Sequence, residues 1–533
     1  MKKRKITAFL LMIVMIVSVF TGCKQDGDVD NKNSDTASNS EKKEQPKKDT
    51  EQKPMDISIA IWDIEDSLSG GESDKILQTL QKETKINIVS QNITWDDADQ
   101  KIKLWAASDG LPDIFAGDFV GKSFFYDWID QGVIRALPDD LSDYPNLQEY
   151  LKIERAQAAK QDGKFYMIPR QTYGDISYSV LDRSVAYRWD LAQKAGVTKE
   201  PETYDEFRDM IKKIIEADPE GKKITGLTAT QPALLTGFIL PYGTILEKKW
   251  IEKDGQWMPG YFAGDMEAAF QLARDMYQEG TIEKDISLAK INTSTEKFLQ
   301  GKSAAILIAG AGPASLYNTV AQDYEELYEG HKFLDDVKIC KLFPCKDGKR
   351  HYFVDTEAWS ESYFSSKVDD EKMERILGLY DYLYSEDGRR LVFCGIEGED
   401  YDLKDDKVIM REGINLNDKY PSTRGICNLA TWNPSSWDMT FPSDIPTEYR
   451  ELNVSRHQDA ADNGTLQEYS DAVLFLSTPL KDKFVMNPND DLMKIMMGSQ
   501  PVDKMLDDLM AEYESKGLSD MLKEVNEAAK NLK

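Results

Sequence analysis

Cysteine and histidine are scarce in this chain, which has five and three of them among 533 residues. So few cysteines exclude a small scaffold held together by disulfides. His331, His351 and His457 are not at the spacing of metal ligands, and Cys340 and Cys345 have no second pair nearby. The sequence therefore predicts no metal site and no cofactor. The spacing of Cys340 and Cys345 leaves open both a disulfide and two free thiols.

Positive charge is also in short supply. The chain has 66 basic and 94 acidic side chains and a net charge of −28. Binding to nucleic acid or to an anionic bilayer depends on basic side chains, so we expect neither as a direct partner. The Gly-x-Ser-x-Gly motif of serine hydrolases is absent. We therefore expect that the protein is not an enzyme. A secreted glycoside hydrolase remains the alternative, because two acids suffice for that chemistry and acids are abundant here.

Long apolar runs are missing except at the N-terminus, where residues 6–20 follow four basic residues. This run is too short for a comfortable membrane span, and the two small residues after it mark a cleavage point before Cys23. The layout resembles the lipobox of bacterial lipoproteins, although Phe20 departs from the usual leucine. We expect residues 1–22 to be a signal peptide and Cys23 to carry lipid, so that the protein is anchored on the extracellular face of the cell membrane. The alternative is an uncleaved N-terminal anchor.

Residues 23–56 contain no aromatic side chain and few apolar ones. Such a segment cannot bury enough surface to offset the entropy lost on ordering, so we expect a flexible polar tether. The remainder of the chain is too long for one ordinary core, and its length predicts two or three domains.

The body of the chain opens with alternating strand and helix patterns. Apolar, β-branched runs at 57–62, 86–89 and 112–116 predict strands, and helical patterns start at Ser73 and cover 98–107. This alternation predicts a parallel βαβ sheet with right-handed crossovers.

Ligands of parallel sheets lie beyond the carboxyl ends of the strands. That rule places Trp62 and Asp63 on the same edge as Asp118. Further patterns predict a strand at 303–308 and helices at 124–131, 146–159, 188–195, 372–384 and from about 503 onward.

Six stretches in order resemble a known family: 103–108 with 111–115, 128–134, 162–169, 298–305, 384–388 and 395–398. The chain resembles the extracellular sugar-binding proteins of ABC importers, in particular the large lipoprotein branch of Gram-positive bacteria. The resemblance implies an α/β fold of two lobes, of the type II periplasmic-binding-protein kind, joined by a hinge of several crossing segments. It also implies a monomer that binds a carbohydrate in the cleft between the lobes and delivers it to an ABC transporter permease.

Carried onto this chain, the resemblance places hinge crossings near 173–178, 354–360 and 424–432. Lobe one then comprises 57–176 and 360–428, and lobe two comprises 177–355 and 429–533. Many family members carry a calcium loop, but the matching stretch here, 218–223, has Lys222 and Lys223 where oxygen ligands should stand. We therefore expect no calcium there.

A carbohydrate site needs flat aromatic faces for the sugar rings and polar side chains for the hydroxyls. Strand ends and expected crossings supply the candidates: Trp62, Asp63, Asp118, Arg170, Asp175, Tyr242, Trp359, Trp432 and Trp437. For Trp62 the alternative is a core position on its strand. A peptide- or amino-acid-binding lipoprotein of the same fold is a further alternative, and it would rely on charged side chains in place of aromatic stacking.

Overall fold

The computed structural model describes residues 53–94, 97–172, 180–181, 185–247, 249–308, 316–354, 358–404, 407–411, 413–431, 446–466 and 469–532. The chain divides into two units, residues 1–51 and 52–533, and all the described residues belong to the second. The expected signal peptide, Cys23 and most of the tether lie outside the described residues, as do Asp175, Trp432 and Trp437.

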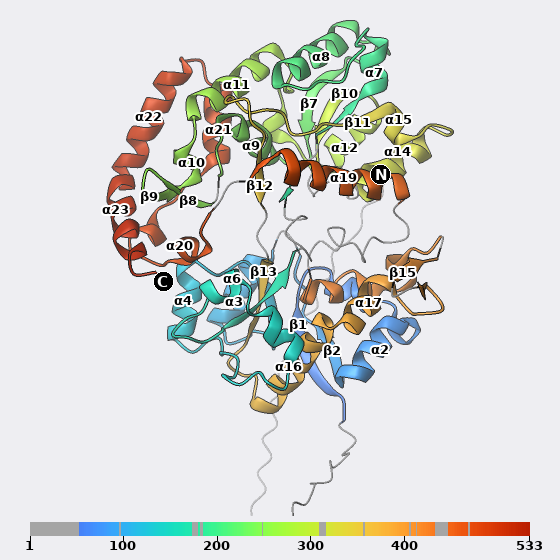
Figure 1. The fold of residues 1–533 in the computed structure, drawn as a ribbon, viewed down its shortest axis with the longest axis vertical. Coiled ribbons are helices and arrows are strands. Elements are labelled where there is room, and N and C mark those ends of the chain that lie inside the picture. Colours follow the sequence, from blue (N-terminus) through green and yellow to red (C-terminus); the bar gives the residue numbers. More distant parts are fainter. Residues whose placement is uncertain are drawn as a thin grey trace, which may run out of the picture. The chain divides into compact units, whose positions relative to one another are not determined.

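Lobe one is built on a five-stranded sheet (Figure 1). Its strand order is β2-β1-β3-β13-β4, with β1 (Met55–Ala60), β2 (Ile86–Ser90), β3 (Ile114–Gly117), β4 (Met167–Gln171) and β13 (Ala358–Phe364). Strand β1 runs parallel to β2 and β3, whereas β13 is antiparallel to β3 and β4. The crossovers are α2 (Lys75–Thr84) and α3 (Ala98–Ala107), so the βαβ sheet expected from the sequence is confirmed.

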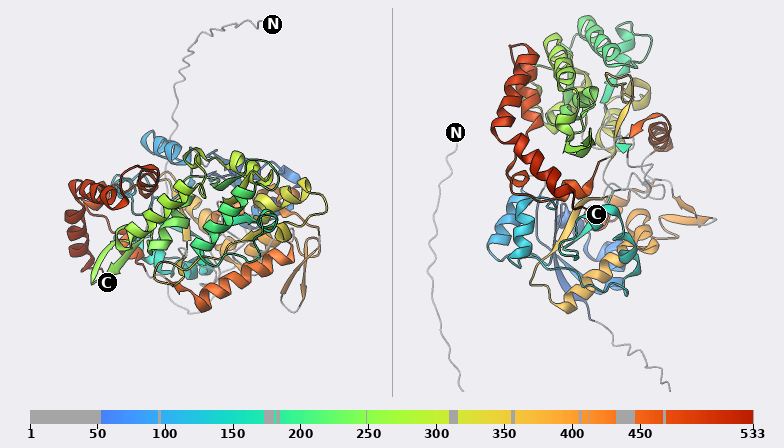
Figure 2. Two further views of the ribbon diagram at one scale, coloured as in Figure 1. Left: turned by 90° about the horizontal axis from the view of Figure 1, so that it is seen from above. Right: turned by 60° about the vertical axis from the view of Figure 1, so that its left-hand side comes forward.

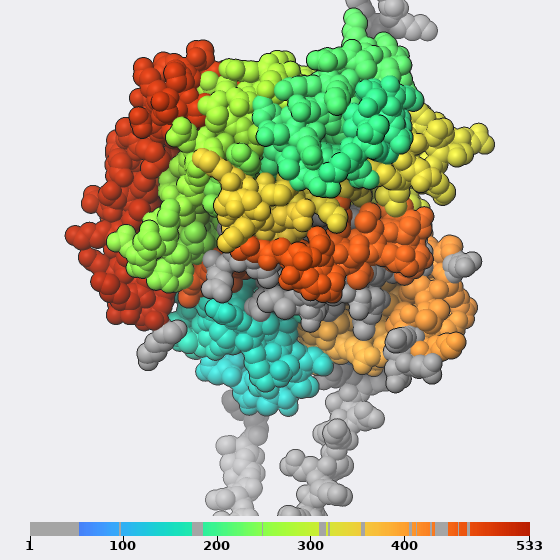
Figure 3. All heavy atoms as spheres, turned by 45° about the horizontal axis from the view of Figure 1, so that its top comes forward, coloured from blue at the N-terminus to red at the C-terminus, as the bar shows by residue number. Residues whose placement is uncertain are grey.

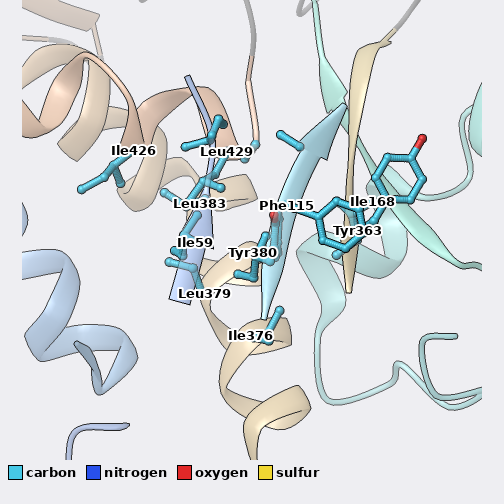
Figure 4. Close-up of a cluster of buried hydrophobic side chains, with 14 of the residues drawn as sticks. Ile59, Phe115, Ile168, Tyr363, Ile376, Leu379, Tyr380, Leu383, Ile426 and Leu429 are labelled. Carbon is cyan, nitrogen blue, oxygen red and sulfur yellow. The ribbon is translucent and has the colours of Figure 1, made fainter. Parts of the chain in front are cut away.

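The core of lobe one joins segments that are far apart in the sequence (Figure 4). Buried side chains come from four strands, from α16 (Asp370–Tyr384) and from η7 (Ile426–Leu429): Ile59, Phe115, Ile168, Tyr363, Ile376, Leu379, Tyr380, Leu383, Ile426 and Leu429. The chain thus returns to the first sheet after building most of lobe two. The other elements of this lobe are α1 (Ile64–Ser67), η1 (Gly71–Ser73), α4 (Ser123–Asp130), α17 (Glu386–Cys394), β14 (Tyr401–Lys404), β15 (Lys407–Met410), α18 (Leu416–Lys419) and η6 (Pro421–Thr423).

Lobe two contains a four-stranded sheet in the order β11-β6-β10-β7. Its strands are β6 (Val185–Arg188), β7 (Thr225–Ala229), β10 (Ser303–Leu307) and β11 (Val337–Ile339). Between them lie α7 (Trp189–Lys194), α8 (Tyr204–Ala217), α9 (Leu234–Ile239), η3 (Leu240–Gly243), β8 (Trp250–Lys253), β9 (Gln256–Pro259), α10 (Gly260–Ala263), α11 (Met266–Glu279), η4 (Ile286–Leu288), α12 (Ile291–Leu299), η5 (Tyr317–Ala321), α14 (Gln322–Leu327) and α15 (Phe333–Asp336).

The C-terminal segment adds α19 (Thr447–Asn463), α20 (Asp471–Phe475), η10 (Lys481–Lys483), α21 (Pro488–Met497), α22 (Val502–Ser515) and α23 (Leu518–Ala529). The last three helices cover the flank of lobe two and bury their apolar faces in its core (Figures 2 and 3). A small sheet, β16-β12-β5, pairs three segments: β5 (Val180–Leu181), β12 (His351–Val354) and β16 (Thr465–Leu466). Strands β5 and β12 adjoin two of the expected hinge crossings. The exact lobe boundaries stay a prediction, because these crossings fall partly outside the described residues.

One helix prediction needs correction. The helix expected over 146–159 is two helices, α5 (Pro145–Tyr150) and α6 (Glu154–Ala158), because Ile153 has an extended backbone with φ −56° and ψ 146°. The helix expected from about residue 503 is confirmed as α22 and α23, which are separated at Gly517 with φ +94°. Among the described residues, no helix combines the length and the apolar character that crossing a membrane requires.

Candidate functional site

Four strand ends of the lobe-one sheet meet at one edge. Strands β1, β3 and β4 end there and β13 begins there, because β13 pairs antiparallel with both of its neighbours. The register sets Ala358 opposite Gln171 and Glu361 opposite Gly117. The segments after β1 and β3 therefore share an edge, as the parallel pattern predicted.

A stack of two tryptophans and an arginine occupies this edge. The rings of Trp62 and Trp359 are nearly parallel, with centroids 5.8 Å apart and an interplanar angle of 19°. The guanidinium carbon of Arg170 lies 4.9 Å from the centroid of Trp62 and 5.3 Å from that of Trp359. Arg170 Nη2 also donates a hydrogen bond to Ser360 Oγ at 2.8 Å. A planar cation in this position attracts both aromatic rings and restricts their orientation.

Exposure separates the three members of the stack. Arg170 is 0% exposed and Trp62 6%, and Trp62 belongs to the core of lobe one, whereas Trp359 is half-buried. The indole of Trp62 therefore lies in the core, which is the alternative given above for this residue. Trp359 is the most exposed member of the stack, and Trp62 and Arg170 pack against it.

The two predicted aspartates of this edge are exposed. Asp63 precedes α1 with a left-handed backbone, φ +63°, and its carbonyl accepts a hydrogen bond from Ser67 Oγ at 2.8 Å. Asp118 follows β3. Their carboxylates are available for polar contacts at the edge that carries the stack.

A buried ion cluster lies on the same strand as Trp359. Arg155 Nη2 is 3.3 Å from Glu361 Oε1, and Arg155 Nη1 is 3.0 Å from Asp471 Oδ1. Tyr363 Oη donates to Glu361 Oε2 at 2.8 Å. Burial raises the pKa of Glu361 to about 7; the Arg155 guanidinium opposes this rise and the charge of Asp118 adds to it.

Sequence reasoning missed this cluster. Glu361 flanks Trp359, but nothing local marks it as buried. Arg155 and Asp471 are 316 positions apart, so only the three-dimensional structure brings them together.

Tyr242 belongs to lobe two. It lies in η3 with its ring 5.2 Å from that of Tyr204, edge to face, and it packs against the core of that lobe. Of the predicted site residues, the structure therefore gathers Trp62, Arg170 and Trp359 into one contact group.

The loop that replaces the family's calcium loop is filled by the chain's own groups. The Asp218 carboxylate accepts hydrogen bonds from the amides of Lys222 and Lys223, both at 3.1 Å. Glu220 is 2.6 Å from both Lys194 Nζ and Lys222 Nζ, and these hydrogen-bonded ammonium groups lower its pKa to about 2. No group of three or more His, Cys, Asp or Glu suited to a metal ion occurs in the part of the chain that the structure describes.

Of the two alternatives for Cys340 and Cys345, the structure shows buried thiols that are not joined by a disulfide. Burial raises the pKa of Cys345 to about 11, so this thiol is protonated and unreactive at neutral pH.

Comparison with known proteins gives one family match. The profile of the family described as "Bacterial extracellular solute-binding protein" matches residues 67–344. The polygalacturonan/rhamnogalacturonan-binding protein YtcQ of Bacillus subtilis (strain 168) is 24% identical over 469 residues, which cover 86% of this chain and 89% of the relative. Lipoprotein LipO of the same organism is 24% identical over 349 residues, which cover 62% of this chain and 64% of LipO.

Solved structures show the same fold. The alginate-binding protein AlgQ2, crystallised without calcium ion, superposes with a TM-score of 0.65 at 18% identity. The match covers 90% of this chain and 98% of AlgQ2. At this identity the likeness concerns the two-lobed fold alone.

Proposed function

Because this chain belongs to the family of bacterial extracellular solute-binding proteins, we propose that it captures an oligosaccharide outside the cell and delivers it to the permease of an ABC importer. The observation that carries the proposal is the half-buried Trp359, packed against Trp62 and Arg170 at the edge of the lobe-one sheet where β1, β3 and β4 end. The cleft between the lobes is the proposed place of capture.

The stack suits a sugar ring for a physical reason. One face of a pyranose carries mainly C–H groups, which pack on a flat aromatic face, and its hydroxyls need polar partners around the rim. Trp359 offers the aromatic surface, and the exposed Asp63 and Asp118 offer acceptors. Arg170 fixes the ring plane before a ligand arrives, which lowers the ordering cost of binding.

Two relatives narrow the class of sugar. YtcQ is a polygalacturonan/rhamnogalacturonan-binding protein, and AlgQ2 is an alginate-binding protein. Both ligands contain uronic acids, so we propose a uronate-containing oligosaccharide.

Three further properties of the protein belong to this proposal: the absence of catalysis, the oligomeric state and the membrane anchor. We propose that the protein binds its sugar without breaking any bond. We also propose that it acts as a monomer and that lipid on Cys23 anchors it at the extracellular face of the cell membrane. The relative LipO is a lipoprotein, which supports the anchor.

Calorimetry tests the proposal with trigalacturonate and, for comparison, a neutral trisaccharide. Trp359→Ala should weaken binding of trigalacturonate by about 1–3 kcal/mol, the range of a stacked aromatic anchor. Trp105→Ala is the matched control, since Trp105 is also a half-buried tryptophan of lobe one but lies on α3. If Trp359→Ala binds trigalacturonate with wild-type affinity, the stack does not bind the sugar. If the wild-type protein binds the neutral trisaccharide more tightly than trigalacturonate, the proposal of a uronate-containing ligand is wrong.

A further inference from the structure

Helix α20 contributes side chains to the cores of both lobes. Val473 is buried in the core of lobe two, and Phe475, two residues later, is buried in the core of lobe one. Leu474 between them packs against both cores. The buried residues of α21, α22 and α23, in contrast, belong to the core of lobe two.

Lobe one holds α20 through charge and shape. The Arg155 guanidinium pairs with Asp471 at 3.0 Å and lies 4.7 Å from the centre of the Phe475 ring. Tyr126 Oη donates to the carbonyl of Phe475. Gly121 lies beside the Leu474 carbonyl and has φ +83°, a backbone conformation that favours glycine.

Lobe two holds the other side of the same helix. The amide of Ser470 donates to the carbonyl of Trp250 at 3.1 Å. Lys481 Nζ donates to the carbonyls of Leu474 and Leu476, both at 2.6 Å, and so satisfies acceptors at the carboxyl end of α20. Both lobes therefore bind the helix by several independent contacts.

The attachment in lobe one is next to the tryptophan stack. Ser360 and Glu361 are consecutive residues of β13, at a shift in its pairing with β4. Ser360 binds Arg170 of the stack, and Glu361 binds Arg155, which holds α20. A ligand that contacts Trp359 would thus act two residues away from Glu361, the residue of β13 that binds Arg155.

We propose that α20 is a permanent joint between the lobes, so that opening and closing rotate the lobes about α20 instead of separating them there. Separation at α20 would take Asp471 away from the buried Arg155 and expose the Phe475 ring to water. Both changes are unfavourable, since a buried ion pair that loses one partner leaves its charge uncompensated. Rotation about a packed element keeps these contacts.

Hydrogen exchange on the sugar-free protein tests the joint, whatever sugar the protein binds. The amides of Leu474 and Leu476 should exchange at least about a hundredfold slower than those of exposed loops, because the joint opens only with the cores. Phe475→Ala should speed hydrogen exchange at the end of α6, where the Ala159 amide donates to the Arg155 carbonyl, and the increase should be about tenfold or more. The same variant should have a larger radius of gyration. Val473→Ala, the control on the same helix, should leave exchange in α6 unchanged, because Val473 packs in the core of lobe two.

Tyr126→Phe provides a milder variant if Phe475→Ala fails to fold. It removes one hydrogen bond to α20 and should speed exchange in α20 severalfold while the protein stays folded. Fast exchange of Leu474 and Leu476 in the wild type would overturn the joint. So would a Phe475→Ala variant with wild-type exchange in α6.

Discussion

Two buried arginines of lobe one differ in what surrounds their guanidinium groups. Arg170 lies over the rings of Trp62 and Trp359, while Arg155 lies between the carboxylates of Glu361 and Asp471. The first arrangement positions two aromatic rings at one edge of the lobe-one sheet. The second arrangement joins segments that are far apart in the sequence. Its charge depends on pH, because Glu361 can bind or release a proton.

Glu361 makes the stability of the protein depend on pH. Burial raises the pKa of Glu361 to about 7 in the folded protein. The Arg155 guanidinium lowers this pKa, and the charge of Asp118 raises it further. An unfolded glutamate has a pKa near 4.5. The folded chain therefore binds more protons than the unfolded chain between these values. The free energy of unfolding should fall as pH rises from about 4.5 to 7, by at most about 1.4 kcal/mol per pH unit.

Urea unfolding of Glu361→Gln at pH 5 to 8 measures this effect. The variant should lose that part of the pH dependence, because a neutral amide has no proton to release. Glu252→Gln is the control, since Glu252 is exposed. Equal slopes for Glu361→Gln and the wild type would show that Glu361 stays ionised throughout.

At the scale of elements, hydrophobic periodicity predicted most helices and strands of the βαβ units. It did not predict the break between α5 and α6, because apolar residues continue through it. Helix α6, which follows the break, carries Arg155. The ion cluster could not be predicted from local sequence, because Arg155 and Asp471 are 316 positions apart.

The loop at 218–223 leads to a prediction about metal removal. Its carboxylates already bind the amides of Lys222 and Lys223 and the ammonium groups of Lys194 and Lys222. A calcium chelator should therefore leave the melting temperature unchanged. Lys222→Ala should lower the free energy of unfolding by at most about 1 kcal/mol, as for a partly exposed ion pair.

Differential scanning calorimetry with and without chelator checks this prediction. A melting temperature that falls with chelator and recovers with added calcium would show that the loop holds the ion despite its lysines.

At the scale of the whole molecule, the sequence predicted the two-lobed fold, and the family match and the structure confirm it. The predicted ligand site stays a prediction. The rule for parallel sheets placed Trp62 and Asp118 at one edge of the sheet, but it could not tell that Arg170 is fully buried, or that Trp359 is more exposed than Trp62. Exposure depends on how strands β4 and β13 pair, and neither strand contains that information by itself.

The proposed membrane anchor depends on Cys23. If lipid is attached there, Cys23→Ala should appear in the culture medium or accumulate as an unprocessed precursor. Fractionation followed by intact-mass measurement checks this outcome. A variant that stays in the membrane fraction with the wild-type mass change would instead support an uncleaved N-terminal anchor.

Native mass spectrometry tests the central claim, that the protein captures an oligosaccharide intact, most directly. The protein is incubated with a mixture of uronate and neutral oligosaccharides, separated from free sugar and measured before and after denaturation. The account predicts one oligosaccharide per chain, released at its original mass, and loss of the complex in Trp359→Ala. Release of shortened sugars would indicate a hydrolase, and a wild-type protein that retains no sugar would contradict carbohydrate capture.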